Sequence, residues 1–351
     1  MIRFEKKNQL ALITLDRETA LNSLNLEMVR LLAAQLPQLI DDKQVSIILI
    51  QGNGAKAFCA GGDVKSVCQK FKSGDFEYGV SFFKTEYQVD LALHSALKPI
   101  IVLGHGIVMG GGIGLFAGGT LRIATSSSVF AMPEISIGLF PDVGASYFLN
   151  RMPGKIGLFL ALTGARFNAT DALDVGLANA FLPDEFRSDF VARLGVEKWL
   201  PSAEANRDRL KNIAVELKQT HALALPPAQI KPVASIINET LATDDPLTAF
   251  NRLQALSSHA NPWLAKAAAN FAKGSPTSAH LIFEQLKRSR ELTLKECFEM
   301  ELKMALQCCR HHDFNEGVRA LLVDKDQKPQ WEPQTWNQVA PELIENHFRE
   351  I

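Results

Sequence analysis

The sequence predicts an α/β fold whose core winds around one axis. Short apolar runs typical of buried strands recur along the first half of the chain, as in VSIILI at 45–50. Small-residue turns follow several of these runs, and segments with apolar residues at helical spacing come after them. The recurring order is strand, strand, helix, which differs from a strict βαβ sandwich. No repeat of 20–50 residues accompanies this order.

The chain opens with two expected strands within 2–15, joined by a polar turn. A helix is expected from Leu26, because apolar residues then recur every three or four positions and Asn25 stands before them as a typical N-cap. Pro37 is expected to kink or end this helix. The strand at 45–50 stops at a Gly-Asn-Gly turn.

The middle of the chain continues in the same style, with glycine and proline marking the turns. The expected elements are a helix from Val64, a polar break at 73–79, a helix at 82–97, strands at 100–103, 121–125 and 129–132, a loop at 133–144, helices at 147–161 and 171–177, and an extended segment at 178–182.

From about Pro183 the character of the sequence changes to mostly helical, with breaks at prolines. Residues 276–312 are expected to form two helices, and 314–331 a compact tail of turns and extended chain. We therefore predict a core over 1–184 that carries the site, and a helical region over 185–351 packed on it as one functional unit.

Composition excludes several classes of protein. The 351 residues are 47% hydrophobic and 21% charged with a net charge of −1, so nothing global indicates a nucleic acid or an anionic membrane as partner. Five cysteines without CxxC spacing disfavour a disulfide framework or a zinc site. The N-terminus is charged, and no apolar run reaches the roughly 18 residues that span a bilayer. We predict a cytosolic protein.

Two glycine turns follow apolar runs. The first is FCAGGD at 58–63, and the second lies in GHGIVMGGG at 104–112. Met109 occupies the place of the third glycine of a dinucleotide-binding loop, so a nicotinamide site is not indicated. Two interpretations stay open: the glycines only allow close packing of helix and strand, or two sets of free N–H groups converge as an oxyanion hole.

Two carboxylates, Glu134 and Asp142, each follow a proline within an apolar stretch. Such acids are either exposed on a loop or buried with a raised pKa, and the prolines would hold them rigidly. Glu86, on an expected helix, is more typical of a solvated acid. The adjacent pairs Cys308-Cys309 and His311-His312 lack a second cluster that would complete a metal site, and no GxSxG elbow indicates a serine hydrolase.

Together these motifs resemble the crotonase (enoyl-CoA hydratase/isomerase) superfamily over essentially the whole chain. The resemblance is carried by FCAGGD (58–63), GHGIVMGGGIG (104–114), AMPEISIGLFPDVGASYFL (131–149) and ALTGARFNATDALDVGLANAF (161–181). SPTS (275–278), HDFNEGVRA (312–320) and LVDKDQKPQW (322–331) are similar to its 3-hydroxyisobutyryl-CoA hydrolase branch. The resemblance implies a spiral of ββα turns with a helical C-terminal region.

The resemblance also implies the parts of a site. The oxyanion hole would be the N–H groups of Gly62 and Gly111, and the backbone near Ala60 would bind coenzyme A. The substrate-contacting residues would be Glu86, Gly111, Glu134 and Asp142. Glu134 would act as nucleophile or as base on water, and Asp142 would orient the substrate or handle the proton of the leaving sulfur.

The activity implied is hydrolysis of a short branched 3-hydroxyacyl-CoA, foremost 3-hydroxyisobutyryl-CoA in valine breakdown. Typical hydratases of the superfamily carry a further glutamate where this chain has Gly114, which argues against hydration. A hydratase or isomerase and an inactive coenzyme A-binding protein remain the alternatives. No metal or redox cofactor is implied, because coenzyme A is part of the substrate, and a homo-oligomer stays open.

Overall fold

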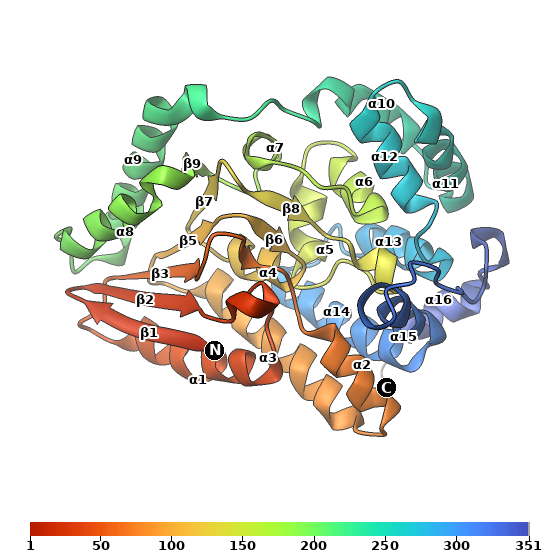
Figure 1. The fold of residues 1–351 in the computed structure, drawn as a ribbon, viewed down its shortest axis with the longest axis horizontal. Coiled ribbons are helices and arrows are strands. Elements are labelled where there is room, and N and C mark those ends of the chain that lie inside the picture. The colour runs from red at the N-terminus through yellow and green to blue at the C-terminus, as the bar shows by residue number, and fades with distance from the viewer. Residues whose placement is uncertain (350–351) are drawn as a thin grey trace. The chain divides into compact units, whose positions relative to one another are not determined.

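The computed structural model describes residues 1–349 and confirms the α/β class (Figure 1). Its internal contacts divide the chain into two compact units that interleave along the sequence. The first unit comprises 1–62, 88–130 and 167–228, and the second comprises 63–87, 131–166 and the described residues from 229 onward. The division by chain order into 1–184 and 185–351 stays a prediction.

The first unit is built on a six-stranded sheet in the order β1-β2-β3-β5-β7-β9. Only β1 and β2 pair antiparallel, and the other neighbours are parallel. The strands are β1 (Ile2–Lys7), β2 (Leu10–Leu15), β3 (Ile47–Gly52), β5 (Ile100–Gly104), β7 (Leu121–Thr125) and β9 (Ala180–Leu182). A second sheet has the order β4-β6-β8, formed by Ala57–Cys59, Ile107–Met109 and Val129–Ala131.

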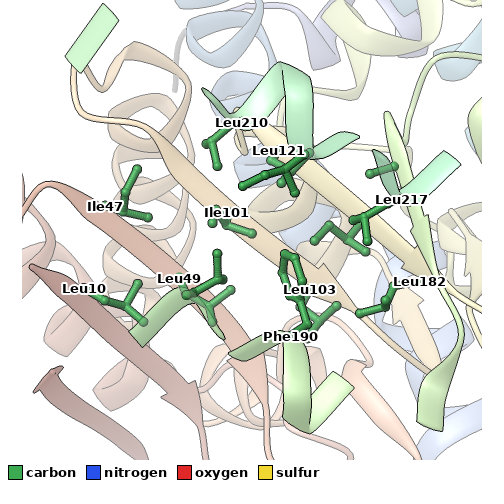
Figure 2. Packing of buried hydrophobic residues seen from close by; sticks show 14 of the residues in the cluster. Leu10, Ile47, Leu49, Ile101, Leu103, Leu121, Leu182, Phe190, Leu210 and Leu217 are labelled. Atoms are coloured by element: carbon green, nitrogen blue, oxygen red, sulfur yellow. The ribbon is translucent and has the colours of Figure 1, made fainter. Parts of the chain in front are cut away.

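Apolar side chains from one face of the large sheet pack against two helices (Figure 2). These helices are α8 (Arg187–Val196) and α9 (Ala203–His221), which supply Phe190, Leu210 and Leu217 to the cluster. Burying an aliphatic or aromatic side chain of this size contributes about 1.5–3 kcal/mol, so the cluster fixes the sheet firmly. The other α-helices of this unit are α1 (Leu26–Asp41), α4 (Gly111–Ala117), α7 (Ala169–Asp174) and the part of α3 (Phe76–Ser95) from Gln88 onward.

The second unit is mainly helical. Its helices are α2 (Val64–Lys72), the first part of α3 (Phe76–Ser95), α5 (Ala145–Phe148), α6 (Ile156–Thr163), α10 (Ala234–Thr240), α11 (Pro246–Ala255), α12 (Pro262–Phe271), α13 (Pro276–Arg288), α14 (Leu294–Arg310), α15 (His312–Val318) and α16 (Pro341–His347). A 3₁₀ turn at Glu134–Ile137 lies within the segment expected as a loop. No helix within 1–349 is long and apolar enough to span a membrane.

Most predicted elements are confirmed, including the N-cap at Asn25, whose side chain accepts from Met28 N–H. Pro37 lies inside α1 and does not end it, so of the two expected outcomes the kink stays a prediction. Two expectations are wrong in detail. The break at 73–79 is shorter, because α3 already begins at Phe76. The helix expected at 147–161 is divided into α5, a 3₁₀ turn and α6, with a turn at Pro153-Gly154 before the last piece.

The tail expected at 314–331 begins instead as helix, with α15 continuing into a π-helical turn at Arg319–Val323. Gly317 lies inside this helical stretch. A Cβ there would lie 2.5 Å from Cα of Ile137. It is therefore a packing glycine, which lets α15 approach the backbone of the 3₁₀ turn that begins at Glu134.

Candidate active site

The two predicted glycine turns lie side by side in the first unit. Strand β4 pairs in parallel with β6, so the segments that leave their carboxyl ends, 60–62 and 110–112, emerge at the same edge of the small sheet. Gly61 has φ +110°, and a Cβ on it would lie 3.7 Å from the backbone nitrogen of Gly111. Glycine is required where the backbone has this conformation and approaches so closely.

Both proposed oxyanion donors have free N–H groups among the described residues. Gly111 begins helix α4, so its N–H has no partner within the helix. Gly62 pairs with Leu24 as an isolated bridge whose hydrogen bond runs from Leu24 N–H to the carbonyl of Gly61, leaving the Gly62 N–H unused. The arrangement offers two neighbouring donors for one oxygen atom, as the chemistry of an oxyanion hole requires.

Ala60 is half-buried beside this pair. Its N–H donates to the carbonyl of Leu21 at 3.0 Å. A ligand can therefore meet the backbone of Ala60 only at its carbonyl oxygen, which accepts from hydroxyl or amino groups. Its role toward coenzyme A stays a prediction.

Replacing Gly112 with alanine is expected to lower the free energy of unfolding by about 1–3 kcal/mol. A Cβ at this position would lie 2.3 Å from the carbonyl oxygen of Cys59 and 2.9 Å from its Cβ. Helix α4 would have to move away from β4, which also displaces the N–H of Gly111. Chemical denaturation of the two proteins measures the difference, and a loss below about 0.5 kcal/mol would contradict this account of the packing.

The second unit brings the three predicted acids together. Glu86, Glu134 and Asp142 are 3%, 5% and 5% exposed. The charge of Asp142 acts on Glu86, and the charges of Asp142 and Glu86 act on Glu134. Helix α3 carries Glu86, the 3₁₀ turn carries Glu134, and the loop before α5 carries Asp142. The expectation that Glu86 is solvated is therefore wrong.

Burial determines the protonation of these acids. It raises the pKa of Glu134 and of Glu86 well above the usual range, and the charge of Asp142 raises both further. Burial also raises the pKa of Asp142, but only to about 6, because the Tyr87 hydroxyl donates to its Oδ2 at 2.6 Å. Asp142 is thus the acid of this group that carries a charge near neutral pH.

Two carboxyl oxygens in this group have no hydrogen-bond partner among residues 1–349. They are Oε1 of Glu86 and Oε2 of Glu134. Buried polar atoms are normally paired, because leaving one without a partner costs about 1–3 kcal/mol. Such atoms are what a substrate hydroxyl or a water molecule would satisfy.

Sequence reasoning missed three residues around Asp142: Tyr87, Gln285 and Glu301. Gln285 and Glu301 are fully buried at helix positions where the apolar pattern calls for a hydrophobic residue. A polar residue on the apolar face of a predicted helix is the signal that could have found them. Within 1–349, no group of His, Cys, Asp and Glu residues is arranged to hold a metal ion.

Comparisons with known proteins identify the family. A profile described as enoyl-CoA hydratase/isomerase matches residues 10–348. The chain is 37% identical to the mitochondrial 3-hydroxyisobutyryl-CoA hydrolase of Danio rerio, covering 100% of this chain and 90% of that protein. The Homo sapiens protein of the same name is also 37% identical, with 100% and 89% covered.

Solved structures agree with this result and confirm the predicted crotonase-type fold. An enoyl-CoA hydratase from Rhodobacter sphaeroides has a TM-score of 0.87 at 30% identity, covering 100% of this chain and 97% of that one. A carnitinyl-CoA dehydratase from Mycobacterium thermoresistibile also has a TM-score of 0.87 at 30% identity, with 100% and 96% covered.

The comparison also corrects one expectation. We predicted a cytosolic protein, whereas these curated relatives are all named as mitochondrial, so the cytosolic prediction is wrong. The free cysteines that supported it are compatible with any reducing compartment and do not single out the cytosol. The matches over the full chain establish that the protein belongs to the enoyl-CoA hydratase/isomerase family, in the group of the 3-hydroxyisobutyryl-CoA hydrolases.

Proposed function

We propose that this protein hydrolyses a short branched 3-hydroxyacyl-CoA thioester, foremost 3-hydroxyisobutyryl-CoA, to the free acid and coenzyme A. The observation that carries the proposal is the buried acid group of Glu134 and Asp142, combined with Gly114 where hydratases of the superfamily have a second glutamate. The names of the full-length relatives support the same substrate. A place in valine breakdown follows if that substrate is correct.

The proposed chemistry uses each part of the site once. The N–H groups of Gly62 and Gly111 would stabilise the negative charge that develops on the thioester oxygen, a contribution of about 3 kcal/mol per donor. Glu134 would attack the carbonyl carbon to give a mixed anhydride that water then hydrolyses, or it would remove a proton from a water molecule that attacks the carbonyl directly. The carbon–sulfur bond breaks when the tetrahedral intermediate collapses. The leaving thiolate takes a proton that Asp142 relays from water, and the acyl group leaves as the free acid with the oxygen of the attacking water. This sequence requires neither a metal ion nor a redox group.

Activity is expected to rise with pH through the neutral range. Glu134 must lose its proton before it attacks or acts as a base, and burial together with the charge of Asp142 raises its pKa well above the usual 4.5. As the pH falls, Glu134 therefore becomes protonated and unreactive at a higher pH than an exposed glutamate would. The acidic limb of the kcat/KM profile reports this protonation in the free enzyme.

The Asp142→Asn variant provides the control for that profile. It removes the charge that raises the Glu134 pKa, so the acidic limb should move to lower pH even though the rates fall. A wild-type profile that is flat from about pH 5 upward would contradict a high pKa for the reactive acid.

Hydration of an enoyl-CoA is the second candidate, because the solved structures with 30% identity are named as a hydratase and a dehydratase. The two activities give different signals in one cuvette. A hydrolase releases a thiol that a thiol-reactive dye detects, whereas a hydratase consumes enoyl absorbance without releasing thiol. We expect thiol release from 3-hydroxyisobutyryl-CoA. Loss of crotonyl-CoA absorbance without thiol release would favour the hydratase, and neither signal would indicate a binding protein.

A further inference from the structure

The loop that carries Asp142 holds one residue, Val143, in a backbone conformation that valine does not favour. Val143 has φ +53° and Gly144 has φ +86°, and a β-branched residue such as valine rarely adopts the left-handed region. Conformations of this kind persist only where surrounding contacts hold them. Within the loop, the N–H of Ala145 donates to the backbone carbonyl of Asp142 at 2.9 Å.

Glu301, on helix α14, supplies contacts that hold this loop. Its Oε2 accepts from the N–H of Gly144 at 2.7 Å, and its Oε1 accepts from the N–H of Ser146 at 2.8 Å. Burial raises the pKa of Glu301 to about 8, while the hydrogen bonds from Gly144 and Ser146 lower it and so favour the ionised form. Hydrogen bonds to an ionised carboxylate are among the stronger ones in proteins. Phe298 of the same helix packs on the loop as well, since a Cβ on Gly144 would lie 3.0 Å from its ring.

The other end of the loop is tied to helix α13. Gln285 donates through Nε2 to the carbonyl of Pro141 at 2.6 Å and to Oγ of Ser146 at 2.8 Å. Asp142 therefore lies between two anchored points, and its own carboxyl receives the hydroxyl of Tyr87. The ring of Tyr87 lies 5.8 Å from that of Phe298, so α14 contacts both the loop and the donor to Asp142.

Glu301 is fully buried and accepts from two buried N–H groups of the loop, so it satisfies these donors as well as fixing their directions. A role in positioning therefore has to be separated from this contribution to stability by measuring catalysis. What a carboxylate offers here is two acceptors in one plane, which fix the directions of two loop N–H groups. An apolar residue could fill the same space without fixing them.

We propose that Glu301 is a positioning residue for the hydrolysis: it holds the loop 141–146 in the conformation that directs Asp142 toward Tyr87 and the substrate. The role rests on the proposed function of Asp142, which would handle the proton of the leaving group. Glu301 itself touches no reacting atom. It acts through the two N–H groups that follow Asp142 in the chain.

A double-mutant cycle on thiol release tests this proposal. Glu301→Gln keeps the volume but offers one acceptor and one donor, so one of the two loop bonds is lost. We expect it to lower kcat about tenfold while KM changes less than about threefold. In the Asp142→Asn background the same change should cost less than about twofold, because residues that act as a unit are not additive.

Equal fold-losses in both backgrounds would overturn the proposal, as would a kcat within twofold of wild type for Glu301→Gln. Rates are expressed per folded protein, measured by circular dichroism in both backgrounds, so that loss of folding does not enter the comparison. Glu299→Gln, the same change at an exposed position of α14, is the matched control and should leave the rate unchanged.

Crystal structures of the wild type and of Glu301→Gln give a readout that does not need activity. We expect the loop 141–146 to shift in the variant and the Tyr87–Asp142 hydrogen bond to break, and an unchanged loop would overturn the proposal. If the wild type releases no thiol but the loop shifts, the proposed function fails and the positioning role stands. If the wild type hydrolyses and the variant matches it in rate and structure, only the positioning role fails.

Discussion

Replacing Glu134 with glutamine is expected to lower thiol release from 3-hydroxyisobutyryl-CoA by at least about a hundredfold. The amide keeps the shape of the side chain but neither accepts a proton from water nor attacks a thioester. General acid–base catalysis by a positioned group typically contributes 10²–10⁴-fold, so its loss should fall in that range. The change is measured as kcat/KM with a thiol-reactive dye.

Binding separates loss of chemistry from loss of folding in this variant. Coenzyme A, measured by calorimetry, should bind Glu134→Gln within about threefold of its affinity for the wild type. Glu291→Gln, at an exposed position of the same unit, should retain full activity. A rate above about a tenth of the wild type, a cost below about 1.4 kcal/mol, would show that Glu134 is not the reacting group.

3-Hydroxyisobutyryl-CoA is expected to exceed isobutyryl-CoA in kcat/KM by about ten- to a hundredfold. Oε1 of Glu86 is buried without a partner in the described part of the chain, and a substrate hydroxyl would pair with it. A substrate that lacks the hydroxyl leaves this atom unsatisfied, which costs about 1–3 kcal/mol. The ratio of the two kcat/KM values measures that cost directly.

Variants on helix α3 assign the preference to a residue. Glu86→Ala should shrink the ratio between the two substrates, whereas Glu77→Ala, exposed near the start of the same helix, should leave it unchanged. Asp142→Asn should lower both rates together if its role is in the proton transfer. Equal kcat/KM values for the two thioesters with wild-type protein would contradict a hydroxyl-reading contact, although hydrolysis itself could remain.

The sequence predicts the strands of the six-stranded sheet well because most of their apolar runs lie beside glycine or proline. It does not predict the three-residue strands β4 and β6, which lie next to the glycine turns. VSIILI, expected as a buried strand at 45–50, overlaps β3 at Ile47–Gly52. Prediction failed where a residue has two uses. Glycine serves both turns and close packing. The segment at 314–331 was expected as turns and extended chain, but it begins as helix α15, in which Gly317 allows close packing.

Some residues of the site could be predicted from the sequence and others could not. Glu134 and Asp142 could be chosen because two acids beside prolines in apolar sequence are unusual, and the structure shows both to be buried. Glu301 could not be connected to Asp142, because 159 positions along the chain separate them and only the packed second unit brings its carboxylate to the loop. A sequence pattern indicates that a polar residue is buried, but its hydrogen-bond partner depends on the tertiary fold.

Hydrolysis in ¹⁸O-labelled water, with the products analysed by mass spectrometry, tests the central claim most directly. Over many turnovers of 3-hydroxyisobutyryl-CoA, we predict that the label enters the carboxylate of free 3-hydroxyisobutyrate, with one coenzyme A released per labelled acid. The Glu134→Gln protein should give almost none of this product. A contradicting result has two parts. The assay with 3-hydroxyisobutyryl-CoA would give no labelled free acid, and an assay with an enoyl-CoA would place the label in the 3-hydroxyl of an intact thioester. That outcome would identify a hydratase.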